Sequence, residues 1–223
     1  MKITKGQAAA AIILATIILD QFIKIWVKTH FYLGEELRIA EWFRLVFVEN
    51  DGMAFGMQMG SKLFLTLFRI VAVTALCWVI VRFCRRTDVG YGFIACLALV
   101  TAGAAGNIID CVCYGVLFND PMPPAVAVMM PDGGGYAPLL YGKVVDMFYF
   151  PLFSFDWPEW MPWVGGENFL FFQPVFNLAD AAISVGMVVI ILFYTKHLSG
   201  SHSDEPAVED QTSRQCEKDN IQL

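Results

Sequence analysis

The stretch FNLADAAIS, residues 176–184, opens the last long apolar run of the chain and places Asp180 about one helical turn inside it. An apolar run of this length is typical of a membrane-spanning helix. A charged side chain at the centre of a bilayer costs roughly 2.5–3.5 kcal/mol on insertion scales, and an intramembrane acid therefore indicates a functional site by default. The alternative is that Asp180 is a buried structural hydrogen-bonding group.

The composition is that of a membrane protein. Of the 223 residues, 57% are hydrophobic and 16% are charged, and the mean hydropathy is +0.56. These values exclude an ordinary soluble domain. The net charge is −6 and no basic stripe is present, so nucleic acid is not an expected partner.

The six cysteines are interpreted as free thiols. Of these, Cys111 and Cys113 are candidates to face an oxidising compartment, and a disulfide across one intervening residue is sterically poor. No histidine accompanies them in a metal-ligand pattern. We therefore expect neither a metal nor a cofactor.

Four apolar runs predict four membrane-spanning helices, at about residues 7–28, 62–82, 90–111 and 175–196. The first run could belong to a cleaved signal peptide, but no small-x-small cleavage site follows it and the apolar character resumes. Basic clusters flank the runs on one side, at Lys2, Lys5, Arg82, Arg85, Arg86 and Lys196. The positive-inside rule therefore predicts that both termini are cytoplasmic.

Residues 30–60 and 112–173 are the predicted outer segments, and residues 199–223 form a polar cytoplasmic tail that we expect to be disordered, which leaves a membrane domain at 1–198. Residues 42–48 predict a β-strand, and Asn50-Asp51-Gly52 is typical of a hairpin tip. Proline and glycine predict irregular structure at 121–138. Residues 147–174 are rich in aromatic side chains, as in segments at the lipid headgroup level.

The polar residues of the predicted helices lie at one depth when positions are counted at about 1.5 Å per residue. They are Asp20, Gln21, Lys24, Asn107, Asp110, Asn177 and Asp180, with Asp146 in the outer loop before the last helix. Because Asp20 and Lys24 are four residues apart, they share a helix face and can pair, whereas snorkelling explains Lys24 alone. A site at the outer edge of the membrane suits chemistry on a membrane-anchored substrate.

We predict that Asp146 and Asp180 face each other. Two carboxylates a few ångströms apart cannot both ionise, so one stays protonated. The ionised acid can take a proton from a water that attacks a peptide carbonyl, while the protonated acid donates to the carbonyl oxygen. This is the aspartic-protease arrangement. The alternative for Asp146 is a loop acid that caps the following segment.

Two other function classes are compatible with a four-span membrane protein. A four-span thiol-redox protein would use Cys111 and Cys113, but it requires a second external cysteine pair that the sequence lacks. A proton-coupled carrier would place ionisable groups near the midplane, usually in repeated halves, and the depth of the polar residues disfavours it. No Ser/His/Asp set or zinc site is visible.

Five blocks of the sequence occur together in a known order. They are Asp20-Gln21-x-x-Lys24, Asn50-x-Gly52-x-Ala54-Phe55, Gly103-Ala104-x-Gly106-Asn107-x-Ile109-Asp110, Val144-Val145-Asp146 and Phe176-Asn177-x-Ala179-Asp180. With these blocks the chain resembles the bacterial lipoprotein signal peptidases (signal peptidase II). The resemblance implies a mainly α integral membrane protein of the bacterial inner membrane, with a four-transmembrane-helix bundle, a small periplasmic β-sheet and long outer loops.

The resemblance also implies an activity. The family members are aspartyl endopeptidases that remove signal peptides from diacylglyceryl-modified prolipoproteins by cleaving before the lipidated cysteine. Their active site lies near the periplasmic face of the inner membrane. The implied catalytic residues are Asp146 and Asp180, the implied substrate-binding residues are Asn50, Gly52, Gly106, Asn107, Asp110 and Asn177, and the implied structural supports are Asp20 and Lys24. Lipidated prolipoproteins and membrane phospholipid are the expected partners, and we expect a monomer.

For several residues, a structural role remains open beside the implied one. Asp110 could be a helix-terminal residue that pairs with Lys24 or Arg69, and Asn107 and Asn177 could satisfy backbone groups at helix ends. The chain also departs from the family pattern. Cys111 stands where the family usually has arginine, Met53 replaces a small residue, and the segments on either side of Asp146 are longer than usual. We expect the added residues to extend the outer face without entering the site.

Overall fold

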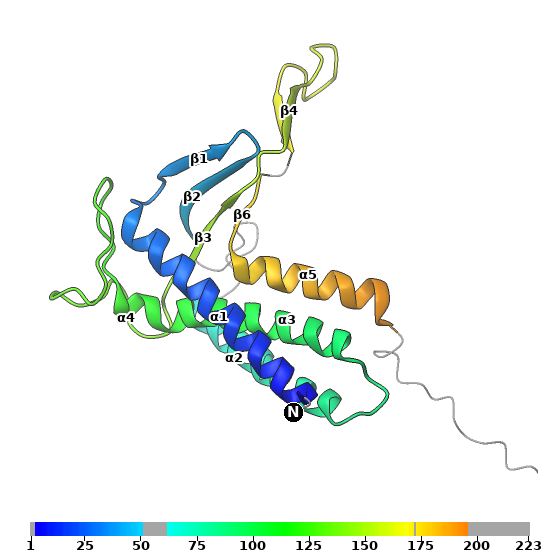
Figure 1. Cartoon of the computed structure of the whole chain (residues 1–223). Coiled ribbons are helices and arrows are strands. Elements are labelled where there is room, and N and C mark those ends of the chain that lie inside the picture. The colour runs from blue at the N-terminus through cyan, green and yellow to red at the C-terminus, as the bar shows by residue number, and fades with distance from the viewer. Residues whose placement is uncertain (1–2, 51–61, 172, 196–223) are drawn as a thin grey trace, which may run out of the picture.

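The computed structural model describes residues 3–50, 62–171 and 173–195 as a group of helices beside a small sheet (Figure 1). The helices are α1 (Lys5–His30), α2 (Lys62–Cys84), α3 (Tyr91–Ile109), the π-helix η2 (Asp110–Tyr114), α4 (Gly115–Leu117) and α5 (Leu178–Phe193). The strands are β1 (Glu36–Ala40), β2 (Phe43–Asn50), β3 (Val144–Tyr149), β4 (Phe153–Asp156), β5 (Asn168–Phe171) and β6 (Val175–Phe176). The predictions for Gly52, Met53 and the tail at 199–223 lie outside the described residues.

The central helix is α3, which packs against α1, α2 and α5. Most of α3 is buried, whereas α1 and α2 expose most of their apolar side chains, as helices in contact with lipid do. Three helical stretches, 5–30, 62–84 and 91–117, are long and apolar enough to cross a membrane. The mainly helical membrane architecture is therefore confirmed. The span predicted at 175–196 corresponds to α5, which is a shorter apolar helix of 16 residues.

The third helical stretch is longer than the sequence predicted. Residues 112–117, which were assigned to an outer segment, continue the helix through η2 and α4. Tyr114 is buried there and packs with Phe118 in an apolar core cluster that also contains Val27 and Phe47. The sequence predicted that this helix ends at about residue 111, whereas the chain stays helical past Asp110, whose buried charge Lys24 compensates.

Small residues allow α3 and α5 to approach closely. A Cβ atom added at Gly103 would lie 2.2 Å from the backbone oxygen of Ala179 and 2.8 Å from a side-chain atom of Ile183. A Cβ atom at Gly186 would lie 2.7 Å from a methyl carbon of Val100. Such contacts between small residues are a common basis of helix association in membranes.

The main sheet has the strand order β1-β2-β3-β6, and all neighbours are antiparallel. The strand predicted at 42–48 corresponds to β2. Asp146 lies within β3 and not in a loop, so that prediction was wrong. Val48 of β2 pairs with Asp146 from almost a hundred residues later, and sequence spacing does not reveal so distant a partner. Phe176 of β6 pairs with Phe148 of β3, which places the start of α5 beside β3.

Outside the main sheet, β4 and β5 form a separate two-stranded antiparallel hairpin. This hairpin lies within the aromatic segment predicted at 147–174. Residues 121–138 contain no helix or named strand, and Met129 makes an isolated bridge with Phe118.

The close approach of α3 and α5 generates the first prediction. We expect Gly103→Ala to lower the free energy of unfolding by about 1–3 kcal/mol, because the added methyl group meets a backbone atom that cannot rotate away. Thermal unfolding in detergent micelles measures the effect. Gly6→Ala on α1 is the matched control, since no atom lies within 4 Å of its added Cβ. Equal melting temperatures for the two variants would contradict this packing.

Candidate active site

The site is built on the first turn of α5, which Asn177 caps. The Asn177 side chain accepts a hydrogen bond from the backbone N–H of Asp180 at 2.9 Å, and the Asp180 carboxylate accepts one from the backbone N–H of Asn177 at 3.4 Å. This reciprocal capping box holds both side chains in place at the helix N-terminus, where the helix dipole favours a negative charge. The capping box therefore fixes the position of Asp180.

The same Asn177 side chain reaches the other acid. Its Nδ2 donates to Asp146 Oδ1 at 2.7 Å and lies 3.1 Å from Asn107 Oδ1 and 3.3 Å from the Val145 carbonyl oxygen. Nδ2 carries two hydrogens, which these three acceptors share. Asn177 is fully buried. One amide therefore links the α5 cap, which carries Asp180, to β3, which carries Asp146.

Asn107 of α3 completes the connection between the helices. Its Nδ2 donates to Asp180 Oδ1 at 2.8 Å, and its Oδ1 accepts from Lys24 Nζ at 2.8 Å. Asn107 thus joins α1, α3 and α5 at one point. Together with the backbone N–H of Asn177, it provides a donor to each carboxylate oxygen of Asp180.

Asp146 is the buried member of the pair of acids. Burial and, second, the negative charge of Asp180 raise the pKa of Asp146 to about 7, although hydrogen bonds from Asn177 and Asn50 act in the opposite direction. Asn50 at the end of β2 donates to Asp146 Oδ2 at 3.4 Å. A carboxyl group with this pKa holds its proton for a large part of the time at neutral pH.

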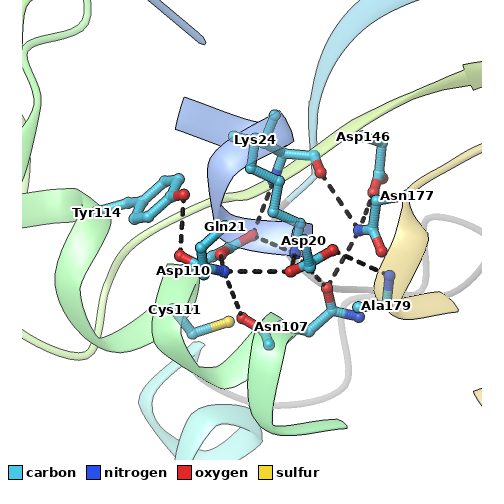
Figure 2. Close-up of polar contacts among 12 residues, drawn as sticks. Asp20, Gln21, Lys24, Asn107, Asp110, Cys111, Tyr114, Asp146, Asn177 and Ala179 are labelled. Carbon is cyan, nitrogen blue, oxygen red and sulfur yellow. Dashed lines mark hydrogen bonds and ion pairs between the residues drawn. The ribbon is translucent and has the colours of Figure 1, made fainter. Parts of the chain in front are cut away.

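A buried ion cluster of Asp20, Lys24 and Asp110 lies beside Asn107, which connects it to Asn177 (Figure 2). Lys24 Nζ is 3.0 Å from Asp20 Oδ2 and 2.8 Å from Asp110 Oδ2, and all three side chains are inaccessible to solvent. Asp20 also accepts from the backbone N–H of Ala179 at 3.0 Å, and Asp110 accepts from that of Val145 at 3.3 Å. The cluster therefore holds the residue that precedes each of the two acids.

Gln21 and Tyr114 also belong to this cluster, although no role was predicted for either residue from the sequence. Gln21 Nε2 lies 2.9 Å from Asp110 Oδ1 and 3.2 Å from both Asp20 Oδ2 and the Gly106 carbonyl oxygen. Tyr114 donates from its hydroxyl to Gln21 Oε1 at 3.1 Å. Gln21 was quoted within a motif, whereas a single tyrosine in an apolar run carries no signal of such a contact.

The structure brings together nine of the ten predicted site residues, and Gly52 lies outside the described residues. Gly106 acts by its lack of a side chain, since an added Cβ would lie 2.7 Å from Asp20 Oδ2. Asp110 pairs with Lys24, one of its two proposed partners. Arg69 of α2, unassigned from the sequence, donates to the sulfur of Cys111 at 3.2 Å. The Arg69 guanidinium therefore lies beside Cys111, the residue after Asp110, although Arg69 belongs to another helix.

Within the described residues, no group of three or more His, Cys, Asp or Glu side chains is arranged to hold a metal ion. The five cysteines of that part of the chain are all free thiols, and Cys111 is buried. What the site offers is the carboxyl groups of Asp146 and Asp180, several amides and the adjoining ion cluster of Lys24 with two further carboxylates.

The chain is similar to one protein family over most of its length. A family model described as signal peptidase (SPase) II matches residues 12–196. The lipoprotein signal peptidase of Porphyromonas gingivalis is 46% identical over 198 residues, which cover 89% of this chain and 87% of the relative. That of Amoebophilus asiaticus is 36% identical over 188 residues, 81% of this chain and 75% of the relative.

One solved structure, described as a bacterial membrane enzyme studied by the in meso method, has the same fold. Its TM-score to this chain is 0.55 at 22% sequence identity, with 88% of this chain and 93% of that chain covered.

The buried ion cluster generates the second prediction. We expect Lys24→Met to lower the free energy of unfolding by about 3–5 kcal/mol, because Asp20 and Asp110 would remain buried without a cation. Thermal unfolding in detergent measures the loss. Arg38→Met is the control: it removes an exposed ion pair with Glu41, and such pairs contribute less than about 1 kcal/mol. If Lys24→Met melts like the control, the cluster does not support the fold.

Proposed function

Because the chain belongs to the signal peptidase (SPase) II family, we propose that it is an aspartyl endopeptidase that removes signal peptides from diacylglyceryl-modified prolipoproteins, before the lipidated cysteine. The observation that carries this proposal is the Asn177 amide, which caps the helix of Asp180 and donates to Asp146. The reaction requires one carboxyl group that accepts a proton and one that donates a proton, and the Asn177 side chain connects the two acids.

The surroundings of the two acids assign them different roles. Asp180 receives N–H donors on both oxygens at a helix N-terminus, and both features stabilise an ionised carboxylate. Asp146 has a pKa raised to about 7 by burial and by the charge of Asp180. We assign Asp180 as the base that accepts a proton from water and Asp146 as the acid that donates to the peptide carbonyl oxygen.

The proposed reaction proceeds in two steps. In the first, the water oxygen bonds to the carbonyl carbon, one water proton moves to Asp180, and the Asp146 proton moves to the carbonyl oxygen. In the second, the carbon–nitrogen bond breaks, Asp180 passes its proton to the leaving amine, and the hydroxyl proton returns to Asp146. The products are an acid and an amine, and both carboxyl groups return to their starting states.

The remaining site residues are proposed to position the acids and to line the substrate site. The side-chain groups of Asn107 and Asn177 are used in hydrogen bonds within the site, which favours a positioning role for both. Asn50 is the last residue of β2 and donates to Asp146, and we propose it as a substrate contact. Asp20, Lys24 and Asp110 are proposed to hold the backbone next to the two acids, at Ala179 and Val145.

The proposed membrane arrangement follows from the helices. α5 measures about 24 Å at 1.5 Å per residue, which is short for a full crossing but sufficient for a fourth span with its flanking residues. The arginines after α2 favour cytoplasmic termini, and the site and main sheet would then lie near the periplasmic face of the inner membrane. A lipidated prolipoprotein would reach the site from the bilayer, with membrane phospholipid around a monomeric enzyme.

The assignment of the two acids generates the third prediction. We expect Asp146→Asn and Asp180→Asn each to insert and fold, yet to cleave a lipidated prolipoprotein at least about 100-fold more slowly, because each removes a proton-transfer group. Gel-based conversion of the precursor measures the rate. Asp132→Asn, at an exposed carboxylate in the irregular segment 121–138, should keep the wild-type rate. Near wild-type turnover in either site variant would exclude that residue from the mechanism.

The raised pKa of Asp146 generates the fourth prediction. Below this pKa, Asp146 holds the proton that it must donate, and above it the proton is lost. We therefore expect kcat/KM to fall as the pH rises through about 7. The pH–rate profile in proteoliposomes tests this expectation, and a rate that stays constant from neutral into alkaline pH would overturn the role of Asp146 as the acid.

A further inference from the structure

The hairpin of β4 and β5 has two unlike faces. Phe153 pairs with Phe171, and Phe155 pairs with Phe169. Paired residues and residues two apart on one strand point to the same side of a sheet. All four phenylalanines therefore lie on one face, which we call the aromatic face. Among the residues whose side chains the structure describes, the opposite face carries Ser154, Asp156 and Asn168, and the Asn168 amide donates to Asp156 Oδ1 at 2.7 Å.

The aromatic face is ordered by ring contacts but is not covered by the rest of the described chain. Phe153 stacks on Phe171 with ring centroids 4.7 Å apart, and Phe155 and Phe169 are 5.1 Å apart. The four side chains nevertheless remain 38–53% exposed. A two-stranded hairpin is marginally stable in water, and a contiguous exposed apolar patch marks an interaction surface.

The loop of the hairpin adds two large exposed rings. Trp160 is 78% exposed and Trp163 is 98% exposed. Tryptophan is enriched at the boundary between lipid headgroups and acyl chains, where its apolar ring and its N–H group are both accommodated. The loop and the aromatic face therefore present the same chemistry.

The position of the hairpin brings it to the membrane. β5 ends at Phe171, six residues before the Asn177 cap of α5, so the two points are at most about 20 Å apart along an extended chain. In Figure 1 the hairpin extends from the main sheet across the direction of α5 and away from the other helices. A segment that crosses the direction of a membrane helix runs parallel to the membrane plane.

Charge decides which kind of contact the hairpin makes. Residues 153–171 contain Asp156, Glu159 and Glu167 and no lysine or arginine. Attraction to anionic headgroups therefore cannot drive binding, whereas insertion of aromatic side chains requires no charge. This composition favours the interface of a zwitterionic lipid surface.

We propose that the β4–β5 hairpin is an interfacial membrane anchor, with the aromatic face, Trp160 and Trp163 in the headgroup region on the side of the membrane where the main sheet lies. Because β4 follows β3 closely, the anchor holds the strand that carries Asp146 next to the lipid surface. This inference concerns lipid contact and does not depend on the peptidase reaction.

Tryptophan quenching in proteoliposomes tests the proposal with the full chain. The emission of Trp160→Phe/Trp163→Phe is subtracted from that of the wild type, which leaves the signal of these two rings. In phosphatidylcholine brominated near the headgroup end of the acyl chains, we expect at least about a twofold loss of this signal relative to unbrominated lipid, with little quenching by aqueous iodide.

Two matched variants place the same charge on the two faces of β4, each measured against its own double-phenylalanine reference. Phe155→Glu should abolish the quenching by brominated lipid, because it buries a charge in the interface, whereas Ser154→Glu on the polar face should retain it. Wild-type rings that iodide quenches and brominated lipid does not would overturn the proposal and favour a protein partner. Equal lipid quenching in wild type and both variants would also overturn it, because the aromatic face would then not be the docking surface.

Discussion

The rest of the site depends on one buried cation. Lys24 lies among apolar helices with no access to solvent, where a lone charge would be prohibitive, and it is tolerated because Asp20 and Asp110 contact it within 3.0 Å. Asp20 accepts the backbone N–H of Ala179 with its other oxygen, and Asp110 accepts that of Val145 with the same oxygen that contacts Lys24. The need to compensate one charge thus ties α1 to α3, to the first turn of α5 and to β3.

This constraint explains how two acids from distant parts of the chain reach one place. Asp146 and Asp180 are each next in sequence to a residue whose backbone the ion cluster holds. Asn177 then joins them, because a capping asparagine accepts with its oxygen and keeps its amide hydrogens for other partners. The cap and the link between the acids are one side chain, so the geometry of the site follows from the way α5 begins.

Several of these relations could be predicted from the sequence, and others could not. The four-residue spacing of Asp20 and Lys24 predicts their ion pair, and the depth of the polar residues predicts their convergence. The position of Asp146 on a strand could not be predicted, because its partner Val48 is almost a hundred residues earlier. Tyr114 was missed for a similar reason: its hydroxyl bonds to Gln21 on another helix, and no local pattern reports such a contact.

The sequence by itself determined that the chain is a helical membrane protein, which residues of it carry costly buried charge, and which family it resembles, because hydropathy, helical spacing and ordered motifs are local properties. The tertiary structure alone decided that Asp146 lies on β3, that Arg69 supplies a cation beside Cys111, and that four phenylalanines share one exposed face of a hairpin. Those features depend on strand register and helix packing between residues far apart in the chain, and register is set by the contacts of the folded molecule.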